Sequence, residues 1–222
     1  MPTETVGSRR ATVVATCPLL LLTALVSHPY LAGRQPNVHA LAHAVASDPT
    51  RWGVVHLATG VGSALLALAF IAIRNHLHES GETRWSNRGL PLVVFGSTLY
   101  AMLPAMELAP LAVVESGGDP AAAQQALLDW FVPVLVLSAV TFGAGMVCFA
   151  LSVLASSVVE PSLDRLIAAS LLVVAISRLV PFTAVQFFVQ SVAWCAALLP
   201  LAYAMWRQPR PAHAATAVAG EV

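Results

Sequence analysis

The chain alternates between long apolar runs and short polar connections, and few charges fall inside the runs. A helix that crosses the hydrocarbon core of a bilayer, about 30 Å thick, needs roughly 20 apolar residues. Six runs approach or exceed this length, at about 11–26, 52–73, 90–114, 130–154, 163–180 and 185–206. Each helix satisfies its own backbone hydrogen bonds, which lipid cannot do. The pattern therefore predicts an all-α, polytopic bundle of six transmembrane helices.

The composition is typical of a protein embedded in a membrane. Of the 222 residues, 58% are hydrophobic and 10% are charged, whereas soluble domains are about 45–50% apolar and about 25% charged. The net charge is zero, so we expect no nucleic acid or other polyanion as a partner. Every basic residue is Arg and none is Lys, which excludes Schiff-base chemistry such as that of a retinal pigment.

The arginines near the ends of the predicted helices indicate how the chain is oriented. Cytoplasmic loops carry an excess of Lys and Arg. With both termini in the cytoplasm, eight arginines lie inside: Arg9, Arg10, Arg74, Arg84, Arg88, Arg165, Arg207 and Arg210. Arg34 and Arg51 lie outside, and Arg178 lies near the outer boundary. We therefore expect a multi-pass protein of the cell membrane with both termini cytoplasmic and the lipid bilayer as its surroundings.

Two segments outside the apolar runs have patterns of their own. The sequence PNVHALAHAVAS at 36–47 predicts a short amphipathic helix on the membrane surface, in the first outer loop. After it, Asp48 is a suitable N-cap, Pro49 suits a first helical turn, and Trp52 suits the membrane interface. The tail at 207–222 is rich in Ala and Pro and predicts a disordered cytoplasmic segment. Residues 1–206 then form a single transmembrane domain.

Small and polar residues recur along the fourth run at spacings of three and four, so in a helix they share one face. They are Ser138, Thr141, Gly145, Cys148 and Ser152. Transmembrane helices associate through such residues because small side chains let two backbones approach closely. We expect this stripe to pack against another helix, and a polar lining for a permeation path is the alternative.

The third run contains one carboxylate, Glu107, within the sequence AMELAP. A charge inside hydrocarbon costs a few kcal/mol or more, so such residues usually face the bundle interior and pair. A rise of about 1.5 Å per residue places Glu107 about 25 Å along the third helix, His56 about 6 Å below the outer start of the second, and Arg178 about 22 Å along the fifth. These three side chains share nearly one depth, which predicts a buried polar cluster.

The sequence leaves three interpretations of this cluster open. A clasp between Glu107 and either Arg178 or His56 would fix the order of the helices. Alternatively, Glu107 is protonated in an apolar setting while Arg178 extends to the outer head groups. In the third interpretation, Glu107 belongs to a site for a proton, a metal ion or a small polar ligand.

Two histidines of the expected surface helix, His39 and His43, are four residues apart and therefore share a face. Together with His56 they are candidate ligands for Zn²⁺ or another divalent ion, and two membrane histidines are also able to ligate a haem. Their H-x-x-x-H spacing lacks the Glu of H-E-x-x-H, so the base of a metalloprotease is missing. We expect no metal, haem or other cofactor.

Two stretches, ASDPTRWGVVHL and AMELAPLAV, resemble a family of small six-helix actinobacterial membrane proteins of unknown function. The matching positions are Pro49, Arg51, Trp52, His56 and Glu107. The resemblance covers most of the chain through short motifs. It implies the six-helix architecture and implies no activity.

No motif indicates a reaction, since the chain has no Ser–His–Asp order, G-x-S-x-G, P-loop or dinucleotide glycine pattern. The leading hypothesis is a non-catalytic membrane component that binds a partner membrane protein, a second copy of the chain or a lipid-like ligand. The alternatives are a small transporter or proton-coupled permease that uses Glu107, and a membrane-embedded metal- or haem-dependent enzyme. A filled core favours binding, a water-connected cavity at Glu107 favours transport, and converging histidines favour a metal.

Overall fold

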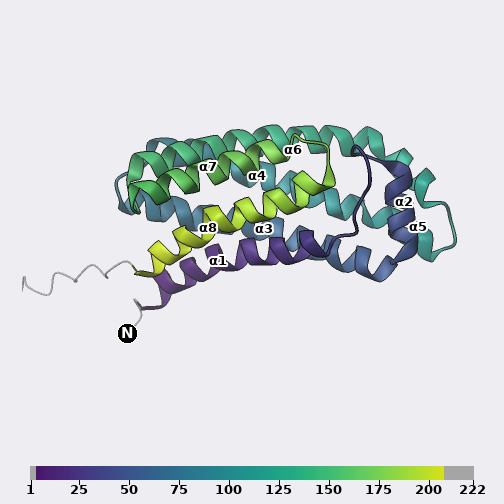
Figure 1. Cartoon of the computed structure of the whole chain (residues 1–222), viewed down its shortest axis with the longest axis horizontal. Coiled ribbons are helices and arrows are strands. Elements are labelled where there is room, and N and C mark those ends of the chain that lie inside the picture. Colours follow the sequence, from purple (N-terminus) through teal and green to yellow (C-terminus); the bar gives the residue numbers. More distant parts are fainter. Residues whose placement is uncertain (1–3, 208–222) are drawn as a thin grey trace, which may run out of the picture.

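The computed structural model describes residues 4–207, and this part of the chain is helical without a β-strand (Figure 1). The prediction of an all-α protein is therefore confirmed for these residues. The elements are α1 (Glu4–Ser27), α2 (Val38–Ser47), α3 (Pro49–Glu79), α4 (Arg84–Met106), α5 (Leu108–Glu115), α6 (Pro120–Ser156), α7 (Pro161–Ser177), the π-helix η1 (Ala184–Val189) and α8 (Gln190–Arg207). The predicted tail lies outside the described residues except for Arg207.

Helices that follow one another in sequence lie side by side, and the last closes against the first. Contacts join α1 to α3, α3 to α4, α4 to α6, α6 to α7, α7 to α8, and α8 to α1. The result is a closed ring of long helices (Figure 1). The start of α1 and the end of α8 lie at one end of this ring, and α2 and α5 lie at the other. We call the two halves the termini half and the α2 half.

Five helical segments are long and apolar enough to cross a membrane, judged by length and composition. They are Gly7–Ser27, Pro49–Glu79, Arg84–Glu115, Pro120–Ser156 and Ala184–Arg207. These correspond to five of the six predicted runs. The remaining run forms α7, which has 17 residues and is not among the five. Its length of about 26 Å, at about 1.5 Å per residue, is shorter than the roughly 30 Å hydrocarbon core.

The third predicted run contains a break that the sequence pattern did not predict. Glu107 separates α4 from α5, with φ −74° and ψ −1°. Pro104 and Pro110 flank it, and a proline has no N–H to donate to the carbonyl four residues earlier. The helical hydrogen-bond ladder is therefore weakened on both sides of Glu107, and the chain turns there.

The predicted amphipathic helix is α2, which lies across the end of the bundle near α5 (Figure 1). The side chain of Asn37 caps it by accepting a hydrogen bond from the N–H of Ala40 at 3.1 Å. Its buried face packs with residues of the neighbouring elements in one apolar cluster, which contains Leu31, Leu41, Ala44, Val45 and Trp52. This helix therefore covers the end of the bundle with its apolar side.

The start of α3 follows the expected capping pattern but places Trp52 differently. Asp48 caps α3, because its side chain accepts a hydrogen bond from the N–H of Arg51 at 3.0 Å, and Pro49 occupies the first turn. The side chain of Trp52, which we expected at the membrane interface, is fully buried within the bundle. Its indole N–H donates to the backbone oxygen of Glu107 at 3.0 Å. The break between α4 and α5 therefore supplies the hydrogen-bond acceptor that a buried indole requires.

The termini half of the bundle is filled by aromatic side chains. Phe70 makes edge-to-face contacts with Phe149 and Trp194, at ring-centroid distances of 4.6 and 6.1 Å, and Phe142 contacts Trp194 at 5.8 Å. All four side chains are fully buried. The interior of the ring is therefore closed here by packed rings.

The predicted stripe of α6 extends from Ser138, near the cavity of the α2 half, to Ser152 in the termini half, and α6 contacts α4. Ser138, Gly145 and Ser152 are buried, whereas Thr141 and Cys148 are half-buried. A Cβ atom on Gly145 would lie 2.6 Å from Cγ2 and 3.0 Å from the backbone N of Val93 on α4. The two backbones approach so closely that only a glycine fits at this position.

Candidate functional site

A cavity of about 250 Å³ occupies the α2 half of the bundle. Its volume is near the lower end of ligand pockets, about 300–1,000 Å³, and exceeds the roughly 150 Å³ of a cavity that holds benzene. Most of its lining is apolar, including Leu25, Leu31, Leu103, Phe131, Leu135 and Phe187. The polar groups that line it include His28, His56, Tyr100, Glu107, Arg178 and Gln186. A mostly apolar cavity with a few polar groups is the usual form of a small-molecule site.

The shortness of α7 explains why this space is open. A Cβ atom on Gly143 of α6 would lie 3.8 Å from Cβ of Ala175, near the end of α7. The part of α6 that lines the cavity, around Leu135 and Ala139, precedes Gly143 and so extends beyond the end of α7. Figure 1 shows α6 continuing past α7 toward α5. In this stretch α6 has no α7 residues beside it.

The rim of the cavity includes side chains that are also exposed on the outside of the bundle. Val136 on α6 is 56% exposed, and Leu179, just after α7, is 63% exposed. Both line the cavity. The cavity therefore reaches the bundle surface between α6 and the end of α7, and this part of its rim is apolar.

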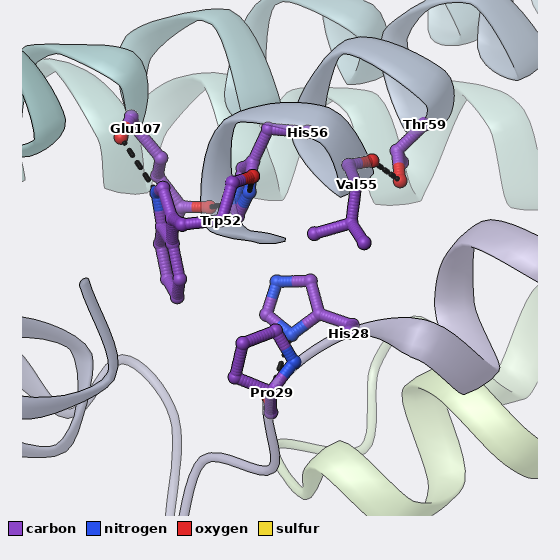
Figure 2. Close-up of polar contacts among 7 residues, drawn as sticks. All are labelled: His28, Pro29, Trp52, Val55, His56, Thr59 and Glu107. Atoms are coloured by element: carbon purple, nitrogen blue, oxygen red, sulfur yellow. Dashed lines mark hydrogen bonds and ion pairs between the residues drawn. The ribbon is translucent and has the colours of Figure 1, made fainter. Parts of the chain in front are cut away.

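Hydrogen bonds link Trp52, His56 and Glu107 (Figure 2), and of these His56 and Glu107 line the cavity. His56 Nε2 lies 2.8 Å from Glu107 Oε2, and His56 Nδ1 lies 2.7 Å from the backbone oxygen of Trp52. The indole N–H of Trp52 in turn donates to the backbone oxygen of Glu107. Glu107 is thus bound to α3 through both its side chain and its backbone, at the break between α4 and α5.

This geometry fixes the number of protons that the pair holds. The oxygen of Trp52 can only accept, so Nδ1 of His56 carries a hydrogen. The contact between Nε2 and the carboxyl group then contains one proton, which is bonded either to His56 or to Glu107. In both forms the pair as a whole has zero net charge. A proton able to occupy either partner therefore lies in the cavity wall.

His28 joins this wall from the loop after α1, and Figure 2 shows its ring beside His56. The ring centroids of His28 and His56 are 4.9 Å apart, and Phe187 of η1 contacts His28 from another side at 4.5 Å. Burial and, second, the neighbouring His56 lower the pKa of His28 to about 3, against the smaller effect of its hydrogen bond to Pro29. The His28 imidazole is therefore neutral at pH 7.

Arg178 follows the last residue of α7 and is 5% exposed. Its guanidinium carbon lies 3.8 Å from the ring centroids of both Tyr100 and Phe142, so the cation lies between two aromatic rings. Within residues 4–207, its three side-chain nitrogens have no hydrogen-bond partner. Cation–π contacts and the negative end of the α7 dipole stabilise the charge, but its N–H donors remain available.

The structure therefore brings His56 and Glu107 together and leaves Arg178 apart from them. Arg178 lines the same cavity as Glu107. The side-chain ion pairs found in the described part of the chain are Arg10–Glu79 and His56–Glu107, so a clasp between Glu107 and Arg178 is not formed. All three side chains line one cavity, and His56 is the partner of Glu107.

The loop between α1 and α2 closes the cavity against the turn after α7. The N–H of Gln35 donates to the oxygen of Pro181 at 2.8 Å, and the hydroxyl of Thr183 donates to the oxygen of Leu31 at 2.7 Å. η1 follows this turn and contributes Gln186 to the lining. Short π-helical segments occur frequently at functional sites.

The candidate metal ligands do not converge. His39 and His43 are exposed on α2, whereas His56 is buried in the cavity wall. Across residues 4–207, no group of three or more His, Cys, Asp or Glu side chains is placed to hold a metal ion. The proposed set of His39, His43 and His56 is wrong because the exposed face of α2 points away from α3. The histidine that does accompany His56 is His28.

Sequence reasoning missed several residues of the site. His28, Tyr100, Gln186 and Phe187 line the cavity, but none belongs to a local motif. The signal available for His28 is a polar residue directly after an apolar run, as in SHPY. For the residues of η1 no comparable signal exists, since a π-helix has no distinct pattern of apolar positions.

Comparison with known proteins identifies no relative of this chain. The chain matches no family model, no curated protein and no solved structure. The resemblance carried by Pro49, Arg51, Trp52, His56 and Glu107 stays a prediction.

Proposed function

We propose that this chain is a multi-pass protein of the cell membrane that binds a lipid-like ligand in its cavity and catalyses no reaction. One observation carries this proposal: a cavity of about 250 Å³, mostly apolar, reaches the apolar surface of the bundle between α6 and the end of α7. A rim that lies at hydrocarbon depth admits apolar chains directly from the bilayer. A binding protein of this kind is the first of the hypotheses that the sequence supports.

In the proposed topology, α7 is a sixth span and both termini are cytoplasmic. Two features support this: α7 completes the ring between α6 and α8, and the arginines of the described helices concentrate in the termini half. Those near this end are Arg9, Arg10, Arg74, Arg84, Arg88, Arg165 and Arg207, whereas Arg34, Arg51 and the buried Arg178 belong to the α2 half. Cytoplasmic loops are the ones rich in arginine.

A reporter that is active only outside the cytoplasm tests the topology. Fused after Val222 it is expected to be silent, and inserted between Gly117 and Gly118 it is expected to be active. Inserted at Val158 or Val159, between α6 and α7, it is expected to be silent again. Activity at that last position would place the α6–α7 connection outside and contradict the proposed orientation.

Binding is favoured over passage because the cavity ends at a packed interior. The ring of Phe142 contacts the guanidinium of Arg178, which lines the cavity, and it also contacts the ring of Trp194 in the termini half. Both rings are fully buried. The aromatic cluster that fills the termini half therefore separates the cavity from the cytoplasmic end, and a ligand enters and leaves on one side.

A cavity-filling substitution tests ligand binding with a closely matched control. Ala139 is buried and lines the cavity, whereas the next residue, Val140, is 58% exposed on the outside of α6. In nanodiscs, Ala139→Trp is expected to abolish the binding of a fluorescent single-chain amphiphile, and Val140→Trp to retain it. Equal binding by both variants would place the ligand outside the cavity and overturn the proposal.

Proton-coupled transport is a second candidate function, favoured by the proton between His56 and Glu107 in the cavity wall. Protein reconstituted into liposomes with a pH-sensitive dye inside tests it. If the site transports, substrate addition moves protons with the wild-type protein, and Glu107→Gln abolishes this movement while the fold is retained. If the protein only binds its ligand, neither form moves protons.

A further inference from the structure

We infer that the ligand of this cavity is a single-chain amphiphile with a monoanionic carboxylate head group, and that Arg178 binds this head group. This inference rests on the proposed function and specifies its ligand class. Three features of the cavity lead to it: the net charge of its wall, the free donors of Arg178, and the apolar exit at its rim.

The charged groups of the cavity wall leave one positive charge without a counterion. The pair of His56 and Glu107 is neutral as a unit in either protonation form, and the pKa of His28 near 3 makes that side chain neutral at pH 7. Arg178 contributes one positive charge that has no ion-pair partner within residues 4–207. A ligand with one negative charge therefore neutralises the cavity, and a ligand with two does not.

The surroundings of Arg178 indicate which ligand geometry fits. Its flat guanidinium lies against the rings of Tyr100 and Phe142, and within residues 4–207 its nitrogens make no hydrogen bond. The donors of a guanidinium lie in its plane and match the two oxygens of a carboxylate, which accept parallel hydrogen bonds. The contacts with the two rings use none of the N–H donors of Arg178 as hydrogen bonds.

A second, smaller space lies beside Arg178, and it is too small for more than one or two hydrogen-bond partners. This space is about 20 Å³ and is also lined by Ser138, Gln186 and Gln190. A water needs about 10–15 Å³, so this space is large enough for one water between Arg178 and the unpartnered Oε1 of Gln190. Arg178 also lines the larger cavity, where its other donors are available to a ligand head group.

The apolar lining specifies the other end of the ligand. From Arg178, the wall continues through Leu135 and Ala139 to Val136 and Leu179 at the exposed rim. A hydrocarbon chain that follows this wall leaves the cavity between α6 and the end of α7, where it continues into lipid. A carboxylate with one alkyl chain satisfies both ends, because its charge meets Arg178 and its chain stays in apolar surroundings.

Three probes of different design separate the contributions of charge and chain. Dodecanoate has both, methyl dodecanoate has the chain without the charge, and acetate has the charge without the chain. Binding is measured by titration calorimetry with protein in nanodiscs of zwitterionic lipid, with empty nanodiscs as the reference. Dodecanoate is expected to bind about 10- to 100-fold more tightly than methyl dodecanoate, as charge-assisted hydrogen bonds imply, and acetate is expected not to bind.

Variants of Arg178 test whether this residue provides the preference. Arg178→Gln is expected to bind dodecanoate and methyl dodecanoate with similar affinity, and Arg178→Lys to keep part of the preference for the acid. Arg34→Gln removes an exposed arginine of the same half and is the control, with an unchanged preference. If Arg178→Gln does not fold, the comparison of acid and ester on the wild-type protein still tests the carboxylate head group, and Arg178→Lys still tests the residue.

The possible outcomes separate this inference from the proposed function. If the wild-type protein binds acid and ester equally, the inference is wrong while binding of a lipid-like ligand stands. If acetate binds as tightly as dodecanoate, the site takes a free anion and the amphiphile is wrong. If the Ala139→Trp variant binds all probes as the wild type does, the proposed function fails together with the inference.

Discussion

The two halves of the bundle use the same helices in different ways. In the termini half, α4 and α6 approach so closely that Gly145 has no space for a side chain, and the rings of Phe70, Phe149 and Trp194 fill the interior. In the α2 half, α4 breaks, α7 ends and η1 replaces a regular helical turn. The cavity lies where these three irregularities meet. The bundle interior is therefore filled where the helices are regular, and it contains a cavity where they are interrupted.

Two carboxylates, Glu82 in the termini half and Glu107 in the α2 half, also differ in their surroundings. Glu82, between α3 and α4, is 7% exposed and accepts hydrogen bonds from the N–H groups of Trp85 and Ser86 at 2.7 and 3.2 Å and from the hydroxyl of Ser152. Burial works to raise its pKa, but these hydrogen bonds outweigh burial and hold the pKa of Glu82 below its ordinary value. Glu107 instead shares a proton with His56.

This contrast indicates what each carboxylate does. Fixed backbone donors surround Glu82 and keep it ionised, so it joins α4 to Ser152 of α6 and stabilises the fold. Glu107 is hydrogen-bonded to His56 and lines the cavity, so it contacts whatever occupies that space. The following substitutions test whether the closed half and the open half differ in this way.

Phe142→Ala is expected to have the largest effect, because this ring belongs to both halves. It packs against Trp194 in the filled interior and against the guanidinium of Arg178 in the cavity. Truncating a buried Phe destabilises a protein by about 3–5 kcal/mol, which thermal unfolding in detergent measures. Phe95→Ala, at a half-exposed position of α4, is the control. Equal losses for the two variants would show that Phe142 does not join the halves.

Gly145→Leu is expected to destabilise the termini half by about 1–3 kcal/mol or more, as overpacking does. The new Cβ atom would meet the backbone N of Val93 at 3.0 Å, and that backbone cannot move without displacing α4. Val140→Leu adds bulk on the exposed side of α6 and is expected to leave the melting temperature unchanged. If both variants melt alike, α4 and α6 are not held by close backbone packing.

Substitution of Glu107 is expected to depend on what replaces it. Glu107→Leu leaves Nε2 of the buried His56 without a partner, at a cost of about 1–3 kcal/mol in the free energy of unfolding. Glu107→Gln is expected to cost less than about 1 kcal/mol, since its amide N–H can donate to Nε2 while Nδ1 donates to Trp52. Recovery of stability when Arg178→Met is added to Glu107→Gln would instead indicate a Glu–Arg clasp.

Glu82→Gln is expected to destabilise the fold by about 1–3 kcal/mol at pH 7, because both oxygens of Glu82 accept hydrogen bonds and the amide nitrogen that replaces one of them cannot accept any. A carboxylate whose pKa is lower in the folded state stabilises the fold above its unfolded pKa, about 4.3, and loses this contribution as the pH falls through the folded pKa. The variant is therefore expected to melt at a lower temperature than the wild type at pH 7, with a smaller difference at pH 3. A constant difference at both pH values would show that the charge of Glu82 does not matter.

The sequence predicted the helices and their extents because these depend on local patterns. The apolar runs at about 52–73, 130–154 and 185–206 lie within α3, α6 and η1–α8, and Asp48 followed by Pro49 marks the start of α3 as expected. The rise of a helix per residue also places His56, Glu107 and Arg178 near one depth. Each of these features needs only the identity and spacing of neighbouring residues.

The tertiary structure decided which of these groups meet. Depth along a helix does not give its rotation, and rotation pairs Glu107 with His56 while leaving Arg178 between two aromatic rings. It also buries Trp52 and turns His39 and His43 away from the cavity. The sequence by itself therefore determined the helical segments and the residues able to carry chemistry. The cavity and its polar wall depend on contacts between segments far apart in the chain, because the crossing and rotation of packed helices are set by all their neighbours together.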